Sequence, residues 1–344
     1  MTAGGATTAE IPVPLEEARL LVAGALGTKR TGDRLTADRF TPKQRAFYAR
    51  DPLWTARTGL GAGVRLGMLS DTASVAFDYA IEYADRDWFR FDLLVNGAFA
   101  ASFGEDRITR RTGRVRFNIP RDRPVERIEI LFPHTLAVAV SNLCLSRGAS
   151  CTPCPRPKGR LLCLGDSILQ GMDARHPIHA LAHAAARFLD LDLLNQSVGG
   201  LVFDPGTLDP DPAFEPDTVL VAYGTNDWDK CADFAAFEAN VTAYVERLVA
   251  LFPAAAIQCI TPIWRADHAT VKATGTLNGI RGAVTAACAP YGRIRVIPGE
   301  SLVPPIPARF DDRGIHPDDT GHLHYALNVL RRMRAADGPA SPRG

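Results

Sequence analysis

The sequence predicts an α/β fold, a parallel sheet with helices on both faces, preceded by an antiparallel β-sandwich. From Arg160 onward, strand-like and helical segments alternate, which is typical of a parallel sheet covered on both sides. Between Gly59 and Gly148, short apolar or alternating segments are separated by polar turns, as in a sandwich. The chain has 344 residues, close to the length at which one core gives way to two.

The expected divisions of the chain follow these changes of pattern. They are an N-terminal extension (residues 1–55), the sandwich (56–150), a proline-rich linker (151–159) and the α/β domain (160–340). The extension is expected to be partly helical. Thr41–Arg50 fits a short helix, because Thr41 is a good N-cap and Pro42 suits the first turn.

Six strands are expected in the sandwich. They are Gly63–Leu69, Ser74–Tyr83, Trp88–Val95, Val115–Ile119, Val125–Phe132 and Leu136–Leu145. The pair Asn96-Gly97 directly follows the third of these strands, and this dipeptide is typical of a tight hairpin turn.

Five strands and four main helices are expected to alternate in the α/β domain. The strands are Leu161–Leu164, Leu191–Leu194, Thr218–Ala222, Ala256–Thr261 and Ile294–Ile297. The helices are His179–Leu189, Phe234–Leu251, Leu277–Ala289 and Thr320–Ala336. Parallel strands end at one common edge of their sheet, so the segments that follow them are expected to lie close together.

Composition and charge exclude several classes of partner. The net charge of +1 and the interleaved acidic and basic residues favour neither a nucleic-acid nor an anionic-membrane partner. No apolar run is long enough to span a membrane. Met1–Glu10 lacks the basic-then-apolar pattern of a signal peptide, so a cytoplasmic location is expected. Nothing in the sequence specifies an oligomeric state.

No metal site is expected in this sequence. Cys151 and Cys154 have the CxxC spacing, but no second pair follows, and a tetrahedral zinc site needs four ligands. His176, His179 and His183 have helical spacing without a carboxylate that converges on them. We therefore interpret the two cysteines as thiols in the linker.

The first strand of the α/β domain ends in Gly165-Asp166-Ser167. A serine at that point lies at the edge where open α/β sheets bind ligands, and a helix that begins there offers N–H groups to negative charge. Ser167 is therefore the candidate nucleophile. On its own, Gly-Asp-Ser favours a plain helix cap, because Asp and Ser are ordinary N-cap residues.

Three later segments supply what acyl transfer requires. They are Asn195–Gly200 after the second strand, Tyr223–Asp227 after the third, and Asp311–Pro317 before the last helix. A serine hydroxyl needs a base, which His316 can provide. The oxyanion needs hydrogen-bond donors, which the N–H groups of Ser167 and Gly200 and the amide of Asn226 can provide. Each segment alone also fits a loop, a cap or a surface turn, so the prediction depends on their combination.

This combination resembles the SGNH (GDSL-type) hydrolases over about residues 160–336. Gly165-Asp166-Ser167 resembles their first block, Gly200 their second-block glycine, Asn226 their third-block asparagine and His316 their fifth-block histidine. The resemblance implies a flavodoxin-like three-layer domain and a serine enzyme without a cofactor. The sandwich is similar to the jelly-roll-like domain of two-domain members, which include carbohydrate esterases and an acyltransferase of natural-product biosynthesis.

One position departs from the family pattern. The family usually has an aspartate three residues before the histidine, where this chain has Arg313. Asp312 and Asp311 lie four and five residues before His316. We expect Asp312 to orient His316 through a shifted turn. The alternative is a backbone carbonyl in that role, which would leave a Ser–His dyad, as in some two-domain esterases of the family.

The expected reaction is acyl transfer through an acyl-Ser167 intermediate. The first candidate is an esterase that acts on a small-molecule ester of a sugar or metabolite. The second is an acyltransferase that moves an acyl group from a donor onto a hydroxyl of a glycoside or polyketide-like acceptor. The third, of another class, is a non-catalytic carbohydrate-binding protein. Trp264 and Arg265 follow the fourth strand and are expected to line the acyl or acceptor pocket, with surface packing as the alternative.

Overall fold

The computed structural model describes residues 10–311 and 313–334, and it divides the chain into two compact units. The first contains the chain up to Asp38 together with Gly59–Arg156, and the second contains Arg39–Thr58 together with the chain from Pro157 onward. The second unit therefore draws one segment from the N-terminal part of the sequence. Within the described ranges, no helix combines the length and the apolar character needed to cross a membrane.

The first unit is a sandwich of two antiparallel sheets, as predicted. One sheet has the order β3 (Gly27–Thr31), β4 (Arg34–Asp38), β11 (Leu136–Ser146), β6 (Ser74–Ala84) and β9 (Thr112–Asn118), with β1 (Glu10–Pro12) paired to β11. The other has the order β12 (Cys151–Pro153), β5 (Arg65–Ser70), β10 (Glu126–Leu131), β7 (Phe89–Val95) and β8 (Ala98–Glu105), with β2 (Val22–Ala23) paired to β5. One short helix, α1 (Leu15–Leu20), lies between β1 and β2 in the sequence.

Buried rings and one tight turn account for the local geometry of the sandwich. The Phe91 ring contacts the rings of Phe77 and Phe132 edge-on, with centroid distances of 5.4 Å and 5.5 Å, respectively.

The predicted hairpin is confirmed: Asn96 and Gly97 join β7 to β8 with φ values of 51° and 81°. Both residue types tolerate this left-handed conformation, which a two-residue turn of this kind requires.

Two segments of the sandwich unit differ from the expected pattern. Residues 10–38 do not form a separate extension, because strands β1 to β4 pair within the two sheets. Cys151–Pro153 is not a linker but the edge strand β12, which pairs with the end of β5. Proline is tolerated on an edge strand, because its missing N–H can face away from the ladder. Strand β8 was not predicted, since its small, largely exposed residues lack a clear apolar alternation.

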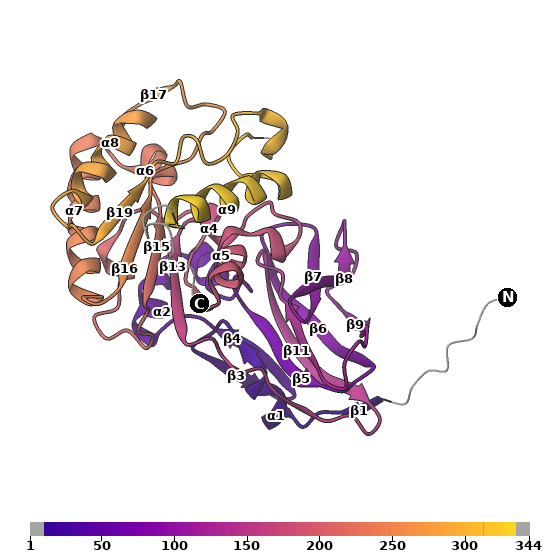
Figure 1. Cartoon of the computed structure of the whole chain (residues 1–344). Coiled ribbons are helices and arrows are strands. Elements are labelled where there is room, and N and C mark those ends of the chain that lie inside the picture. Colours follow the sequence, from indigo (N-terminus) through magenta and orange to yellow (C-terminus); the bar gives the residue numbers. More distant parts are fainter. Residues whose placement is uncertain (1–9, 312, 335–344) are drawn as a thin grey trace, which may run out of the picture. The chain divides into compact units, whose positions relative to one another are not determined.

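The second unit contains a five-stranded parallel sheet in the order β14 (Leu191–Asn195), β13 (Gly159–Gly165), β15 (Thr218–Ala222), β16 (Ala256–Ile260) and β19 (Ile294–Ile297). On one face α7 (Phe234–Leu251) packs beside α8 (Leu277–Cys288), and on the other α5 (Leu181–Leu189) packs beside α9 (Asp319–Arg334) (Figure 1). The predicted three-layer fold is confirmed. The last two residues of the predicted final helix, Ala335 and Ala336, lie outside the described residues.

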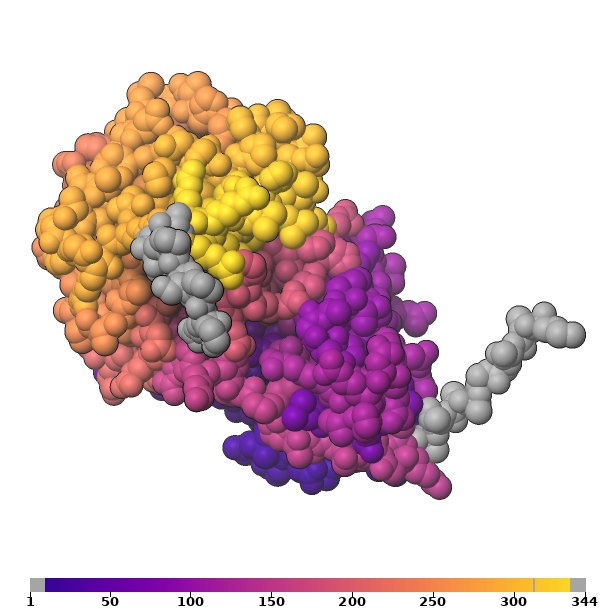
Figure 2. Space-filling model, viewed as in Figure 1, coloured from indigo at the N-terminus to yellow at the C-terminus, as the bar shows by residue number. Residues whose placement is uncertain are grey.

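Several shorter elements complete this unit. They are α2 (Pro42–Tyr48), α3 (Pro52–Thr58), α4 (Ser167–Gln170), α6 (Thr225–Lys230), the hairpin β17 (Val271–Lys272) and β18 (Gly275–Thr276), and 3₁₀ turns at Pro177–His179, Pro205–Thr207 and Pro307–Arg309. In the space-filling view, the yellow atoms of α9 form part of the surface of this unit (Figure 2). Leu323 and Leu327 on this helix are exposed.

The segment Arg39–Thr58 is tied to the loop after β14 by a buried cation. Arg39 is fully buried, and its guanidinium donates to the carbonyl oxygens of Asn195, Ser197 and Arg57. The predicted helix cap is confirmed: Thr41 and the third residue of α2 exchange hydrogen bonds in a capping box. Local caps form these helices, and Arg39 fixes them beside the loop that carries Gly200.

Candidate active site

Ser167 is the first residue of α4, directly beyond the end of β13. Asp166 caps this helix, because its Oδ1 accepts a hydrogen bond from the Ile168 N–H at 2.9 Å. Gly165 has no room for a side chain, since a Cβ there would come within 2.8 Å of the Ala222 carbonyl oxygen. The two interpretations of Gly-Asp-Ser are therefore compatible. The aspartate caps the helix, and the serine is the residue presented beside the histidine.

The structure brings Ser167 and His316 together as predicted. The Ser167 Oγ lies 2.8 Å from Nε2 of His316, and both side chains are almost fully buried. The loop that carries the histidine folds back on itself, because the Asp311 N–H donates to the His316 carbonyl oxygen at 2.8 Å. A serine hydroxyl in this position can pass its proton to the imidazole as it attacks.

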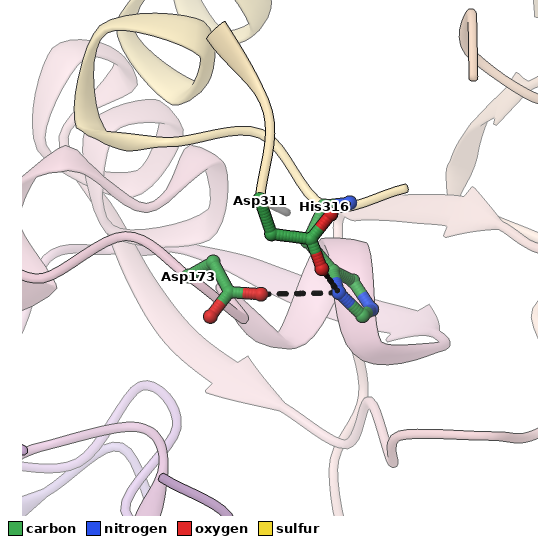
Figure 3. A group of neighbouring side chains, drawn as sticks. All are labelled: Asp173, Asp311 and His316. Atoms are coloured by element: carbon green, nitrogen blue, oxygen red, sulfur yellow. Dashed lines mark hydrogen bonds and ion pairs between the residues drawn. The ribbon is translucent and has the colours of Figure 1, made fainter. Parts of the chain in front are cut away.

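Two carboxylates face the other ring nitrogen of His316 (Figure 3). Its Nδ1 lies 3.0 Å from Oδ2 of Asp311 and 3.1 Å from Oδ2 of Asp173. Asp173 has a φ of 68°, a left-handed conformation that Asp and Asn adopt more readily than other residues with side chains. An N–H at Nδ1 directed at these carboxylates leaves Nε2 unprotonated and ready to accept the serine proton.

The carboxylate that orients His316 differs from the prediction. Asp312, the expected residue, lies outside the described residues, and the contact to Nδ1 is made by Asp311. The backbone hydrogen bond between residues 311 and 316 places them opposite each other in the folded loop. Residues that face each other in this way direct their side chains to the same face, so the Asp311 carboxylate meets the His316 ring. The dyad alternative is also not observed, since carboxylates rather than a backbone carbonyl contact Nδ1. Asp173 carried no recognisable sequence signal.

Burial and charge have opposite effects on the pKa values at this site. Burial lowers the pKa of His316, but the hydrogen bonds and charges of Asp173 and Asp311 outweigh it, so the pKa is raised above the ordinary 6.5. Burial raises the pKa of Asp311, but hydrogen bonds from His316 and the Ile315 N–H outweigh it, so the pKa is lowered. The site therefore keeps Asp311 ionised and stabilises the imidazolium that forms during attack.

The predicted oxyanion donors lie at the starts of α4 and α6 and in the loop after β14, and hydrogen bonds connect these segments. The Val198 N–H donates to the Gly165 carbonyl oxygen at 3.0 Å, which joins the loop after β14 to the end of β13. The amide of Asn226 donates to the Leu201 carbonyl oxygen at 2.9 Å, which leaves its second hydrogen available. Among the described residues, the N–H groups of Ser167 and Gly200 have no hydrogen-bond acceptor. Both are therefore available to an oxyanion.

The side chains around Nδ1 of the histidine, those of Asp173, Asp311 and His316 itself, could also hold a metal ion. In the part of the chain that is described, they form the one group of three or more His, Cys, Asp or Glu side chains whose ligand atoms lie close enough to share an ion. A metal ligand at Nδ1 would have to use the lone pair of a nitrogen that otherwise donates to the carboxylates. Because Nε2 contacts Ser167, we assign the group to orienting the histidine.

Trp264 and Arg265 have different roles in the structure. Trp264 lines a cavity of about 590 Å³, and its ring lies 4.9 Å from that of Phe310, the residue before Asp311. The guanidinium of Arg265 is buried and pairs with Asp229 at 2.8 Å and Asp267 at 2.6 Å. Arg265 is not among the residues that line that cavity.

Residues 163–323 match the GDSL-like Lipase/Acylhydrolase family. The structure is similar to the salicylyl-acyltransferase SsfX3 from a tetracycline biosynthetic pathway, with 20% identity, a TM-score of 0.77, and coverage of 96% of this chain and 98% of that one. A family two carbohydrate esterase from Cellvibrio japonicus has 17% identity, a TM-score of 0.65 and coverage of 96% and 98%. Another, from Clostridium thermocellum in complex with cellohexaose, has 15% identity, a TM-score of 0.62 and coverage of 81% and 94%. These likenesses establish the fold. No curated protein matches the sequence.

Proposed function

Because its α/β unit belongs to the GDSL-like lipase/acylhydrolase family, we propose that this chain is a serine esterase that cleaves an acyl ester of a sugar or small metabolite. The observation that carries the proposal is the continuous series of contacts from Ser167 through His316 to Asp311. A hydroxyl, an imidazole and a carboxylate in this order are the groups that acyl transfer through serine requires.

The first half of the proposed reaction forms the acyl-enzyme. The Ser167 Oγ attacks the ester carbonyl carbon while its proton passes to Nε2 of His316. The carbonyl electrons move onto oxygen, and the N–H groups of Ser167 and Gly200 with the Asn226 amide stabilise the oxyanion. When the intermediate collapses, the bond from carbon to the leaving alcohol breaks, and the imidazolium returns its proton to that alcohol.

The second half repeats these steps with a different nucleophile. Water gives its proton to His316 and attacks the acyl carbon, and collapse of the intermediate releases the acid and the free Ser167 hydroxyl. Asp311 and Asp173 remain ionised partners of the imidazolium in both halves.

The cavity beside Trp264 supports a substrate rich in hydroxyl groups. It lies beyond the carboxyl ends of β16 and β19, on the same sheet edge as Ser167. Its lining combines Trp264 with the polar side chains of Asn278, Arg281 and Glu300. A sugar presents both apolar faces and hydroxyl groups, and the carbohydrate esterase of similar fold is in complex with cellohexaose.

An acyltransferase is the alternative within the same chemistry. It is supported by the similarity of fold to a salicylyl-acyltransferase over 96% of this chain. The two activities differ in whether water or a bound alcohol reaches the acyl-serine. A carbohydrate-binding protein without catalysis is disfavoured, because Ser167, Asn226 and His316 are all present and the first and last are in contact.

Release of p-nitrophenol from p-nitrophenyl acetate tests the proposal. Ser167→Ala is expected to lose about a thousandfold or more in rate, since the nucleophile is removed. Ser197→Ala is the matched control, because Ser197 is a buried serine in the neighbouring loop. Equal rates in wild type and Ser167→Ala would favour the binding protein. Adding alcohols to the wild type then separates the two activities, since an acyltransferase forms a new ester faster than free acid.

A further inference from the structure

We infer that Arg57 of α3 and Lys230 of α6 are positioning residues that fix the direction of the Gly200 N–H. The inference depends on the proposed function, in which this N–H receives the negative charge of the tetrahedral intermediate. Neither residue belongs to the four sequence blocks that predict the site. Both contact the turn Gly199-Gly200 through its carbonyl oxygens.

The two cations hold consecutive carbonyl groups of this turn. The Arg57 guanidinium donates from Nη1 to the Gly199 carbonyl oxygen at 2.7 Å. The Lys230 ammonium donates to the Gly200 carbonyl oxygen at 2.6 Å. The next carbonyl, that of Leu201, accepts from Asn226 at 2.9 Å. Side chains from two different helices therefore fix three successive peptide groups.

The geometry of the peptide bond converts the Arg57 contact into a direction for the donor, and the Lys230 contact fixes the peptide unit that follows it. In a trans peptide unit the C=O and the N–H point in opposite directions. Because Arg57 holds the Gly199 C=O, the Gly200 N–H of the same unit points away from Arg57. A hydrogen bond to the carbonyl also polarises the peptide group, which makes its N–H a stronger donor.

The neighbouring N–H groups are already used within the protein. Val198 donates to Gly165 O at 3.0 Å, Gly199 donates to the Gln170 side chain at 2.8 Å, and Leu201 donates to Val198 O at 3.2 Å. The first two bonds hold the turn against residues 165–170, and the third closes the turn on itself. In the described structure, Gly200 alone of the four offers an N–H with no acceptor.

Glycine at position 200 is what allows this approach. Its φ of 84° is a conformation that side chains rarely adopt. A Cβ there would also lie 3.1 Å from Nη1 of Arg57 and 3.3 Å from Nζ of Lys230. The missing side chain therefore leaves room for both cations beside the turn. Their charges add positive potential near the place where the oxyanion forms.

The position of α3 explains why an N-terminal segment contributes to this site. The side chain of Asp51 caps α3 by accepting from the Leu53 N–H at 2.7 Å. Trp54 on this helix stacks on Phe47 of α2, with an interplanar angle of 10°. These contacts and the buried Arg39 present Arg57 to the turn from a segment that belongs to the same compact unit.

Kinetics of Arg57→Met and Lys230→Met with p-nitrophenyl acetate test the inference. We expect each variant to lower kcat by about tenfold to a hundredfold with KM changed less than about threefold, because the contact acts on the transition state. A boronic acid that mimics the tetrahedral intermediate should lose affinity in proportion to kcat/KM. Arg57→Lys and Lys230→Arg keep the charge and should recover part of the rate.

Two controls separate the inference from a general loss of structure and from the proposed function. Arg50→Met removes an exposed cation of the same segment that does not contact the turn, and should leave kcat unchanged. Lys230 is exposed, so its variant tests the inference even if Arg57→Met unfolds. Unchanged kcat in both Met variants, with Ser167→Ala inactive, overturns the inference alone. Full activity in Ser167→Ala overturns the proposed function and this inference with it.

Discussion

The carboxylate of Asp173 lies 3.1 Å from Nδ1 of His316, the nitrogen that Asp311 contacts at 3.0 Å. One N–H therefore faces two acceptors from different loops, one after α4 and one before α9. Because either carboxylate can accept this hydrogen bond, each can hold the ring when the other is removed. The arrangement duplicates a role that a single aspartate usually has in a catalytic triad.

Asparagine substitutions test this duplication. Loss of the only aspartate of a triad lowers kcat by about 10⁴. We expect Asp311→Asn and Asp173→Asn each to lose less than about a hundredfold, and the double variant to approach about 10⁴. Asn tolerates the positive φ of position 173, so the backbone there is retained. Steady-state rates of the three variants measure how far one carboxylate replaces the other. A single variant as slow as the double variant would contradict the duplication.

The acid limb of the pH profile reports the same two carboxylates. Groups that act on His316 by charge or hydrogen bonding are Asp173, Asp311, Asp166 and His322. The enzyme needs a neutral His316, so kcat/KM should fall as the pH drops below its raised pKa, above 6.5. Asp173→Asn removes a charge that favours the imidazolium, so its acid limb should move to lower pH. An unchanged limb would show that Asp173 does not act on the histidine.

Gly200→Ala should lower activity because it distorts the turn, and not because it destabilises the whole fold. The residue has a φ of 84°, and a Cβ there would lie 3.1 Å from Arg57. Gly97 is the matched control, because its φ is 81° and a Cβ there would meet nothing within 4 Å. Both variants should lose about 1–2 kcal/mol through backbone strain. Only Gly200→Ala should lower kcat, and equal activity of the two variants in the ester assay would refute this account of the turn.

The buried guanidinium of Arg39 should stabilise the α/β unit. Its replacement by Met leaves the carbonyl groups of Asn195, Ser197 and Arg57 without this donor. Buried acceptors without partners are costly, so we expect Arg39→Met to lower the free energy of unfolding by about 3 kcal/mol. Urea denaturation measures this change. Arg50→Met is the exposed control and should differ from wild type by less than about 0.5 kcal/mol, and a similar value for both variants would count against the role of Arg39.

The sequence predicted best what depends on local pattern and on chain order. The strands and helices of the α/β unit, and the meeting of Ser167 with His316, follow from apolar segments that end at one sheet edge. Strand β8 was missed because it has little apolar alternation. Strands β1 to β4 were missed because short segments pair only when the rest of the sandwich is present.

Other features depend on contacts that no local pattern records. Asp311 rather than its neighbour reaches His316 because a backbone hydrogen bond folds the loop back on itself. Asp173 reaches it through a positive φ, which the sequence does not reveal at a non-glycine position. Arg57 approaches Gly199 from a segment more than a hundred residues earlier in the chain, and such long-range packing cannot be read from spacing.

Labelling with a fluorophosphonate tests the central claim most directly, because this reagent phosphonylates a serine that a neighbouring base activates. Peptide mapping by mass spectrometry should find the label on Ser167, and the labelling rate should fall at least about a hundredfold in His316→Ala. A label on another residue, or the same rate at Ser167 in His316→Ala, would contradict the account.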